Sequence, residues 1–332
     1  MEYSKRLGKL ASCQFQAALS KHELGDFLSA APVQSGLFGQ NVFLTSTKGK
    51  FVLRGKPHYP WQFPKERFGA KLLHRYTKVP VPYPYLYDSN IDIFGWEYIL
   101  MPCMPGISPV NEKISNNERI DIAFALGKNL AEVHQCKLSF SGEYDLSTDT
   151  IKPMATSYDD WFFMDIENWL EKLDGHYGIV EDEANWVREF MHKNIHLLSN
   201  NIQPCFVMND YNPGNILVEK NKGEWLVTGL FDLMEYYFGD GDADFVRLMA
   251  IYLDNYTNNA SSLIKAFIKG YFSKTEKKSN IIEKIRLFFL RDRLIVWEYG
   301  TRPDVAWFNK ENSFVGYVKR YMDNKDIHEA FM

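Results

Sequence analysis

The chain has 332 residues, of which 45% are hydrophobic and 24% charged, and its formal net charge is −4. At roughly 150 residues per domain, this length predicts two domains or lobes that can bury a sizeable core. The slightly acidic balance argues against a nucleic-acid partner, because phosphate backbones call for a basic face. No apolar run reaches the about 18 residues of a membrane-spanning helix, so we expect no membrane partner either.

Cysteine spacing and the N-terminal sequence bear on the compartment. Cys13, Cys103, Cys136 and Cys205 contain no CxxC pair, which makes a zinc ribbon or a redox motif unexpected. The first residues lack the apolar segment of a secretory signal. We therefore expect a cytoplasmic protein. A monomer or a homodimer is expected as its oligomeric state.

The first hundred residues predict a mixed α/β lobe. A short helix is expected over Lys21–Ser29, and β-like runs over Val33–Thr47 and Lys50–Arg54, joined by a tight turn. Pro64–Tyr76 predicts a helix, because proline suits a first turn and apolar residues follow at helical spacing. Trp96–Met101 predicts a further strand.

A short, proline-rich stretch at Met101–Gly106 is the predicted boundary between lobes. Beyond it, two β-like runs, Asn215–Val218 and Trp225–Phe231, predict a hairpin. The other predicted elements are helices, at Asn117–Cys136, Trp161–Leu173, Glu183–Leu198, Asp244–Leu253, Ile282–Trp297 and Phe314–Met322. The chain is thus predicted to be an α+β protein, with a small β-rich N-lobe over residues 1–104 and a larger, mainly helical C-lobe over residues 105–332.

The most informative stretch contains Asp210 and Asn215, five residues apart, and is followed by Asp232 at the end of the predicted hairpin. A lone aspartate in a loop is most often a turn former or a helix cap. Phosphoryl-transfer enzymes, however, use this spacing for a base and two metal ligands. Asp210 could accept a proton from a hydroxyl, while Asn215 and Asp232 could hold Mg²⁺ against the phosphates of a nucleotide.

These motifs resemble those of the aminoglycoside phosphotransferase and choline kinase group, which has a two-lobed protein-kinase-like fold. That group usually has His-Gly-Asp, four residues and Asn, then Ile-Asp-Phe or Ile-Asp-Trp, then Gly-Asp-Pro-x-x-Asp. This chain has Met208–Asn215, Leu230–Asp232 and Gly239–Asp244 in the same order. The resemblance implies ATP, or GTP, as the donor together with Mg²⁺, and it assigns Asp244 to bracing the catalytic loop.

Two positions depart from the group's pattern. Met208 replaces the histidine and can pack but barely hydrogen-bond, whereas Asn209 replaces the glycine and tolerates a left-handed backbone well. The carboxylates remain, but loop rigidity is affected, which leaves a catalytically weakened, pseudokinase-like nucleotide-binding module as an alternative. His134, at a predicted helix end, is expected to be structural.

The N-terminal segment offers candidate nucleotide contacts. Ser35, Gly36, Gly39 and Asn41 could form a phosphate-covering loop, because glycines let backbone amides approach phosphate oxygens. A plain hairpin turn is the alternative, and the resemblance favours the phosphate loop. The backbone near Met101 and Cys103 would cradle the adenine.

Arg54 stands where the group usually has a lysine that grips the phosphates. Lys56 lies on the same face of the predicted strand and could share this task. Glu66, on the following helix, is the expected partner of the cation. The alternative is a surface salt bridge, which would contribute little.

The phosphate acceptor is expected to lie next to Asp210 and to carry a hydroxyl. Acidic and aromatic side chains together would suit an amine through ion pairing and cation–π contacts, although solvated carboxylates and core aromatics are the alternative. The candidates are Asp159, Asp160, Asp165, Glu235, Glu298, Asp304, Trp161, Trp297 and Tyr299. We therefore predict an ATP-dependent phosphotransferase for a small, amine-bearing molecule such as an aminoglycoside or an amino alcohol.

Overall fold

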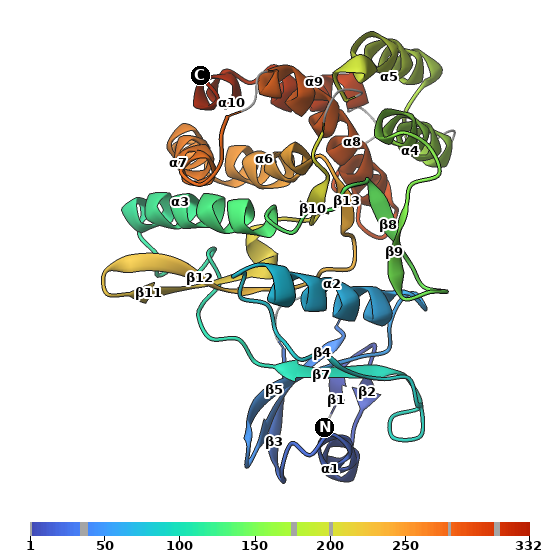
Figure 1. Ribbon diagram of the computed structural model, residues 1–332, viewed down its shortest axis with the longest axis vertical. Helices are drawn as coiled ribbons and strands as arrows, with labels where there is room; N and C mark the ends of the chain where they lie inside the picture. Colours follow the sequence, from blue (N-terminus) through green and yellow to red (C-terminus); the bar gives the residue numbers. More distant parts are fainter. Residues whose placement is uncertain (1, 34–38, 174–177, 199–201, 278–279, 309–312) are drawn as a thin grey trace. The chain divides into compact units, whose positions relative to one another are not determined.

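A computed structural model describes residues 2–33, 39–173, 178–198, 202–277, 280–308 and 313–332 (Figure 1). The chain forms two compact units, each made of several segments. The first unit comprises Met1–Asn111, Tyr144–Thr150 and Pro213–Glu235, and the second comprises Glu112–Glu143, Ile151–Asn212 and Tyr236–Met332. The single division after residue 104 stays a prediction.

An antiparallel five-stranded sheet forms the centre of the first unit, in the order β3-β4-β5-β7-β6. Its strands are β3 (Phe27–Pro32), β4 (Asn41–Ser46), β5 (Gly49–Gly55), β6 (Leu86–Asp88) and β7 (Tyr98–Pro102). A short ribbon of β1 (Glu2–Ser4) and β2 (Gly8–Lys9) precedes it, and α2 (Gln62–Tyr76) follows β5. The strand predicted at residues 50–54 and the helix predicted at residues 64–76 are therefore confirmed.

The helix predicted at Lys21–Ser29 is wrong. The helix of this region is α1 (Ser12–Lys21), which ends where the prediction began, and β3 starts only six residues later. Gly25 has a φ of +84°, and a Cβ there would lie 2.4 Å from the Thr47 hydroxyl oxygen. A helix cannot continue through that left-handed residue, so the chain turns here into the sheet.

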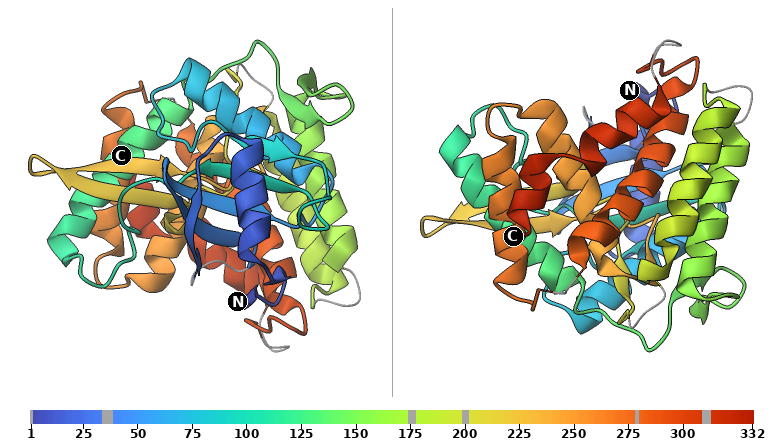
Figure 2. Two further views of the ribbon diagram at one scale, coloured as in Figure 1. Left: turned by 90° about the horizontal axis from the view of Figure 1, so that it is seen from below. Right: turned by 90° about the horizontal axis from the view of Figure 1, so that it is seen from above.

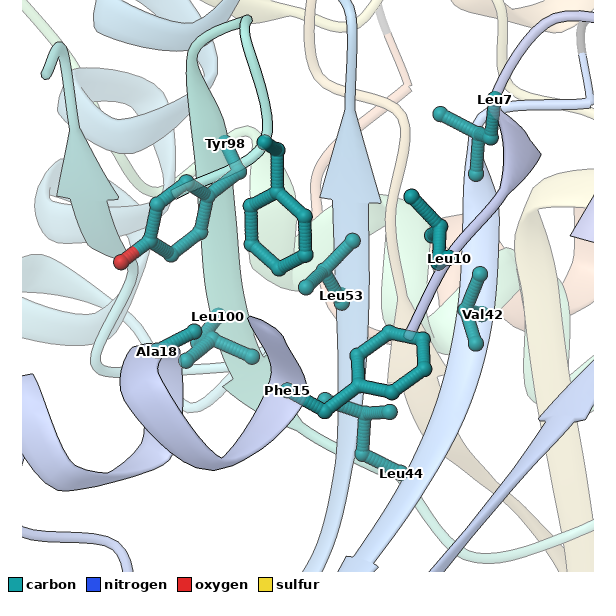
Figure 3. Packing of buried hydrophobic residues seen from close by; sticks show 10 residues of the cluster. Leu7, Leu10, Phe15, Ala18, Val42, Leu44, Leu53, Tyr98 and Leu100 are labelled. Carbon is teal, nitrogen blue, oxygen red and sulfur yellow. The ribbon is translucent and has the colours of Figure 1, made fainter. Parts of the chain in front are cut away.

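Apolar side chains of α1 pack onto one face of this sheet (Figure 3). Phe15 and Ala18 of the helix meet Leu44, Leu53 and Leu100 of the strands in one buried cluster. Because side chains alternate along a strand, anchoring Leu53 in this cluster turns its neighbour on β5, residue 54, to the opposite face.

A long two-stranded ribbon also belongs to the first unit (Figures 1 and 2). It consists of β11 (Ile216–Asn221) and β12 (Glu224–Leu230), as the sequence predicted. Lys222 and Gly223 both have positive φ, as two-residue hairpin turns require. Backbone bonds from Leu230 to Pro80 and between Ile107 and Val218 fasten the ribbon to the rest of the unit.

The second unit is mainly helical. Its helix α8 lies between α4 and α6 (Figure 1). It also contains most of a four-stranded sheet in the order β10-β13-β8-β9. The sheet consists of β8 (Gly142–Asp145), β9 (Thr150–Pro153), β10 (Cys205–Val207) and β13 (Tyr237–Gly239), and its residues 144, 145 and 150 belong to the first unit. The helices are α3 (Asn116–Val133), α4 (Tyr158–Leu173), α5 (Glu181–Asn194), α6 (Phe245–Asn255), α7 (Ala260–Phe272), α8 (Ile281–Thr301), α9 (Phe314–Met322) and α10 (Lys325–Ala330).

All six helices predicted for this region are present, whereas α7 and α10 were not predicted. Within the ranges that the structure describes, no helix combines the length and the apolar character needed to cross a lipid bilayer.

Helices α3 and α7 approach each other through glycines. A Cβ added at Gly127 would lie 2.0 Å from the carbonyl oxygen of Phe267, and one added at Gly270 would lie 2.1 Å from that of Phe124. Both obstacles are backbone atoms, which cannot rotate aside. These two glycines therefore set the separation of the helices.

We predict that Gly270→Ala lowers the free energy of unfolding by about 2 kcal/mol or more, because the methyl group overpacks a rigid crossing. Gly316→Ala is the matched control in α9, where a Cβ would meet only the Ser313 side chain, at 3.7 Å. Alanine favours helix there by about 1 kcal/mol, so the control should be neutral or stabilising. Urea denaturation measures both, and equal effects of the two substitutions would contradict this account.

Candidate active site

One carboxylate holds the loop that carries Asp210. Asp244 closes the 3₁₀ helix η3 (Gly241–Asp244) and is buried. Its Oδ2 accepts the amide of Met208 at 2.7 Å, and its Oδ1 accepts the amide of Asn209 at 2.7 Å. Two successive amides on one carboxylate fix the loop's direction immediately before Asp210.

His134 supports that carboxylate from the C-terminal end of α3. Its Nε2 lies 3.2 Å from Asp244 Oδ2, and its Nδ1 lies 2.8 Å from the hydroxyl of Tyr271. All three side chains are buried. The histidine thus orients Asp244, in agreement with its expected structural role, while the buried Met208 supplies packing where the related group has its histidine.

Asn209 gives the loop a further anchor that a glycine could not provide. Its φ is +64°, the left-handed conformation that asparagine tolerates. Its side-chain oxygen accepts a hydrogen bond from Nη1 of Arg291 at 2.6 Å. Arg291 in turn donates to Asp165 at 2.7 Å and lies 5.4 Å from the ring centroid of Trp161. The departure from glycine therefore adds a contact to the loop.

Asp210 itself is partly exposed, with a side-chain exposure of 35%. Nε of Arg247, from α6, lies 3.7 Å from its Oδ1 and 2.8 Å from Oδ1 of Asp292 on α8. Burial opposes the ionisation of Asp292, yet Arg247 and Arg293 hold its pKa below the usual range. Arg247 and Asp292 were not predicted as site residues from the sequence, because only the fold brings α6 and α8 together here.

In the first unit, a buried guanidinium joins three predicted site residues. Nη1 of Arg54 lies 3.2 Å from Glu66 Oε2, and its Nη2 lies 3.1 Å from Asp232 Oδ1. Gln62 donates to Glu66 at 3.2 Å. With 6% exposure for Arg54 and none for Glu66, the alternative of a surface salt bridge is wrong.

Lys56 does not share this position. Its backbone φ is +55°, and its ammonium donates to the carbonyl oxygen of Arg6 at 3.1 Å. Arg54 is therefore the cation that faces the helix α2 and the end of the hairpin.

Asn215 and Asp232 lie at the same end of the β11–β12 hairpin. Asn215 closes a 3₁₀ turn, η2 (Pro213–Asn215), and its carbonyl accepts the amide of Phe231 at 3.1 Å. Arg54 holds Oδ1 of Asp232, while Oδ2 makes no hydrogen bond or ion pair to the described residues. A carboxylate and an amide oxygen fit Mg²⁺, which usually takes one or two protein ligands and completes its octahedron with phosphates and waters.

The other predicted nucleotide contacts are only partly described. Ser35 and Gly36 lie outside the described residues. Gly39 has a φ of +58°, and Asn41 pairs with Arg54 across β4 and β5. Met101 is buried in β7. The amide of Cys103 already donates to the carbonyl of Lys50 at 3.0 Å, so this amide is not available to an adenine ring.

Three of the six acidic residues expected around the acceptor pair with other protein groups. Asp165 pairs with Arg291, Glu298 pairs with Arg302 at 2.8 Å, and Asp160 accepts the Ser157 hydroxyl at 2.8 Å. Trp297 is 1% exposed and stacks on Phe308 in the core. The prediction that Trp297 lines a substrate site is therefore wrong.

Residues 29–281 match the sequence profile of the phosphotransferase enzyme family. The chain belongs to this family. No curated protein sequence matches it. Membership confirms the prediction of a phosphotransferase, and it covers the segments that carry Arg54, Asp210 and Asp232.

Solved structures confirm the protein-kinase-like fold. A thermostable mutant of aminoglycoside phosphotransferase APH(4)-Ia, in ternary complex with ADP and hygromycin B, has a TM-score of 0.65 at 12% identity, over 94% of this chain and 98% of that one. A candidate fructosamine-3-kinase from Thermobifida fusca has a TM-score of 0.60 at 13% identity, over 95% and 97%. The GDP complex of aminoglycoside 2'-phosphotransferase-IIIa has 0.59 at 14%, over 96% and 99%.

The buried pair in the first unit predicts a pH dependence of stability. Burial raises the pKa of Glu66 to about 7, because lost hydration outweighs the attraction of Arg54. Glu66 therefore contributes stability that is fully present below its unfolded pKa of about 4.3. That contribution is lost as the pH rises through about 7.

Relative to Glu66→Gln, the wild-type protein should therefore lose on the order of 2 kcal/mol of unfolding free energy between pH 5 and pH 8. Glutamine has nearly the same shape as glutamate and does not titrate. The difference between the two proteins therefore removes the contribution of all other titrating groups. Urea denaturation at the two pH values checks this. A difference between the proteins that does not change with pH would contradict it.

Proposed function

We propose that this phosphotransferase uses ATP and Mg²⁺ to phosphorylate a hydroxyl of a small molecule. The observation that carries the proposal is the position of Arg54, which pairs with both Glu66 and Asp232 in a buried setting. A cation on a strand, tied to a helix carboxylate and to the carboxylate after a hairpin, is the arrangement that kinases use for nucleotide phosphates.

In the nucleotide half of the reaction, Arg54 would hold phosphate oxygens. A guanidinium offers a planar fork of donors that matches phosphate, whereas a lysine offers a point charge. Asn215 and Asp232 would hold Mg²⁺, which when bound supplies neutralising charge at the phosphates. Oδ2 of Asp232, which has no partner among the described residues, is the oxygen that suits a metal.

In the acceptor half, Asp210 would orient the hydroxyl and accept its proton at a carboxylate oxygen. Such base catalysis contributes about 10²–10⁴-fold, provided that the carboxylate is held in place. Asp244 and Arg291 provide that restraint, since they bind the two residues that precede Asp210. The same contacts argue against the pseudokinase-like alternative, which rested on a loosened loop.

The nucleotide and the acceptor are proposed in less detail. ADP in the APH(4)-Ia complex and GDP in the 2'-phosphotransferase-IIIa complex support a purine nucleotide, with ATP proposed and GTP as the alternative. Hygromycin B in the first complex supports a small hydroxyl-bearing acceptor. An amine on the acceptor stays a prediction from the sequence.

We predict that Asp210→Asn lowers turnover at least about a hundredfold, because asparagine cannot accept the proton. Its unfolding free energy should change little, since Asp210 is partly exposed. ADP release, coupled to a spectroscopic signal and measured with the acceptor library described below, gives the rate. Asp121→Asn, on the exposed face of α3, is the control and should keep wild-type turnover.

A folded Asp210→Asn variant with normal turnover would refute the assignment of the base. Thermal unfolding with ATP, with and without Mg²⁺, tests the nucleotide half independently. Stabilisation that requires Mg²⁺ and disappears in Asp232→Asn supports the proposal, and no response to any nucleotide overturns it.

A further inference from the structure

Arg247 has a guanidinium edge that no group of the described residues occupies. It lies in the first turn of α6, and its side chain is 20% exposed. Its Nε faces Asp292 and Asp210, at 2.8 and 3.7 Å. Among the described residues, neither terminal nitrogen makes a hydrogen bond. Two donors therefore remain available beside the proposed base.

The anchoring of Arg247 keeps this edge open. Asp292 lies closer to Nε than Asp210 does, so the buried carboxylate holds the inner side of the guanidinium. Arg293 donates to the other oxygen of Asp292 and fixes that carboxylate in turn. The contact with Asp292 is an ion pair, since Nε makes no hydrogen bond to the described residues. It places the guanidinium with its terminal nitrogens outward, and these nitrogens form the fork by which arginine binds carboxylates in a bidentate manner.

The charge around the loop does not favour a cationic acceptor. Apart from the buried Asp244, the carboxylates at the loop are Asp165, Asp210 and Asp292. Three guanidinium groups, those of Arg247, Arg291 and Arg293, face them. Asp210 must be ionised to accept a proton in the proposed reaction, so its charge counts in this set. The three carboxylates and three guanidinium groups therefore balance, and the outer fork of Arg247 is the part of this set with which an anionic group can pair.

We propose that Arg247 binds a carboxylate of the acceptor, which makes the substrate a short hydroxy acid. This inference rests on the proposed function. The hydroxyl must reach Asp210 while the carboxylate reaches the outer fork of Arg247, and the two side chains are 3.7 Å apart at their nearest charged atoms. This short separation calls for a short carbon chain between the hydroxyl and the carboxylate, and we propose two to five carbons.

Matched acceptors test this proposal. The library contains unbranched hydroxy acids, amino alcohols and diols of two to five carbons, each with a terminal hydroxyl, and ADP release is measured with Mg²⁺ and ATP. The wild-type protein should show its highest kcat/KM with the acids. Phosphate monoesters of the same diols form a separate arm of the experiment. A higher kcat/KM with these monoesters than with the hydroxy acids would overturn the assignment of a carboxylate.

Variants at residue 247 tie the preference to the structure. Arg247→Gln should lower kcat/KM for the acids about 10- to 100-fold, mainly through KM, because a charge-assisted contact is lost. The loss for the diols should be smaller. The kcat/KM of Arg247→Lys for the acids should lie between those of the wild-type protein and Arg247→Gln, because lysine keeps the charge but lacks the fork. Arg188→Gln, which breaks a half-exposed ion pair with Glu167 between α5 and α4, is the control and should keep the acid preference.

If no member of the library is turned over, the proposal is tested by the binding of the acids, measured by thermal unfolding. In the presence of Mg²⁺ and a non-hydrolysable ATP analogue, the acids should raise the unfolding temperature of the wild-type protein and not that of Arg247→Gln. The inference is overturned if amino alcohols or diols are preferred, if Arg247→Gln weakens all acceptors equally, or if no acid binds. Stabilisation by Mg²⁺ and nucleotide without an acid preference overturns this inference alone, whereas no response to nucleotide overturns the proposed function.

Discussion

The buried guanidinium of Arg54 is the constraint on which the first unit depends. A buried charge costs several kcal/mol unless it is paired, and Arg54 is paired with a helix carboxylate and with the carboxylate that follows the hairpin. One side chain thus ties β5, α2 and the end of β12 together. The core beneath α1 fixes Leu53 (Figure 3). Because side chains alternate along a strand, this directs Arg54 to the other face of the sheet.

The second unit applies the same principle to the loop before Asp210. Asp244, supported by His134, accepts two backbone amides, and Arg291 holds the side chain of Asn209. The histidine and glycine of the related group are absent from this loop, yet hydrogen bonds from α3, η3 and α8 restrain it. Hydrogen bonds to neighbouring elements therefore keep the loop rigid, which explains how Met208 and Asn209 can be accommodated.

Local patterns predicted much of this structure, because strand alternation, helical periodicity and turn residues act over a few positions. The hairpin that ends at Asp232 and the helix Phe314–Met322 followed from such patterns. The prediction at Lys21–Ser29 failed because nothing in the apolar pattern shows that Gly25 adopts a left-handed backbone against Thr47. Contacts between distant segments could not be predicted either. The pairing of Arg247 with Asp292 depends on the packing of α6 against α8. Trp297 is buried in the core, but a tryptophan can equally line a binding site, so its residue type alone did not reveal its position.

The most direct measurement of the central claim is the affinity for Mg²⁺ and ATP of the wild-type protein and of Arg54→Met, by isothermal titration calorimetry at pH 7. If the buried guanidinium binds the phosphates, Arg54→Met should weaken binding at least about tenfold, since a charge-assisted contact is lost, while Arg54→Lys retains part of the affinity. A folded Arg54→Met protein that binds the nucleotide as tightly as the wild type would contradict the account.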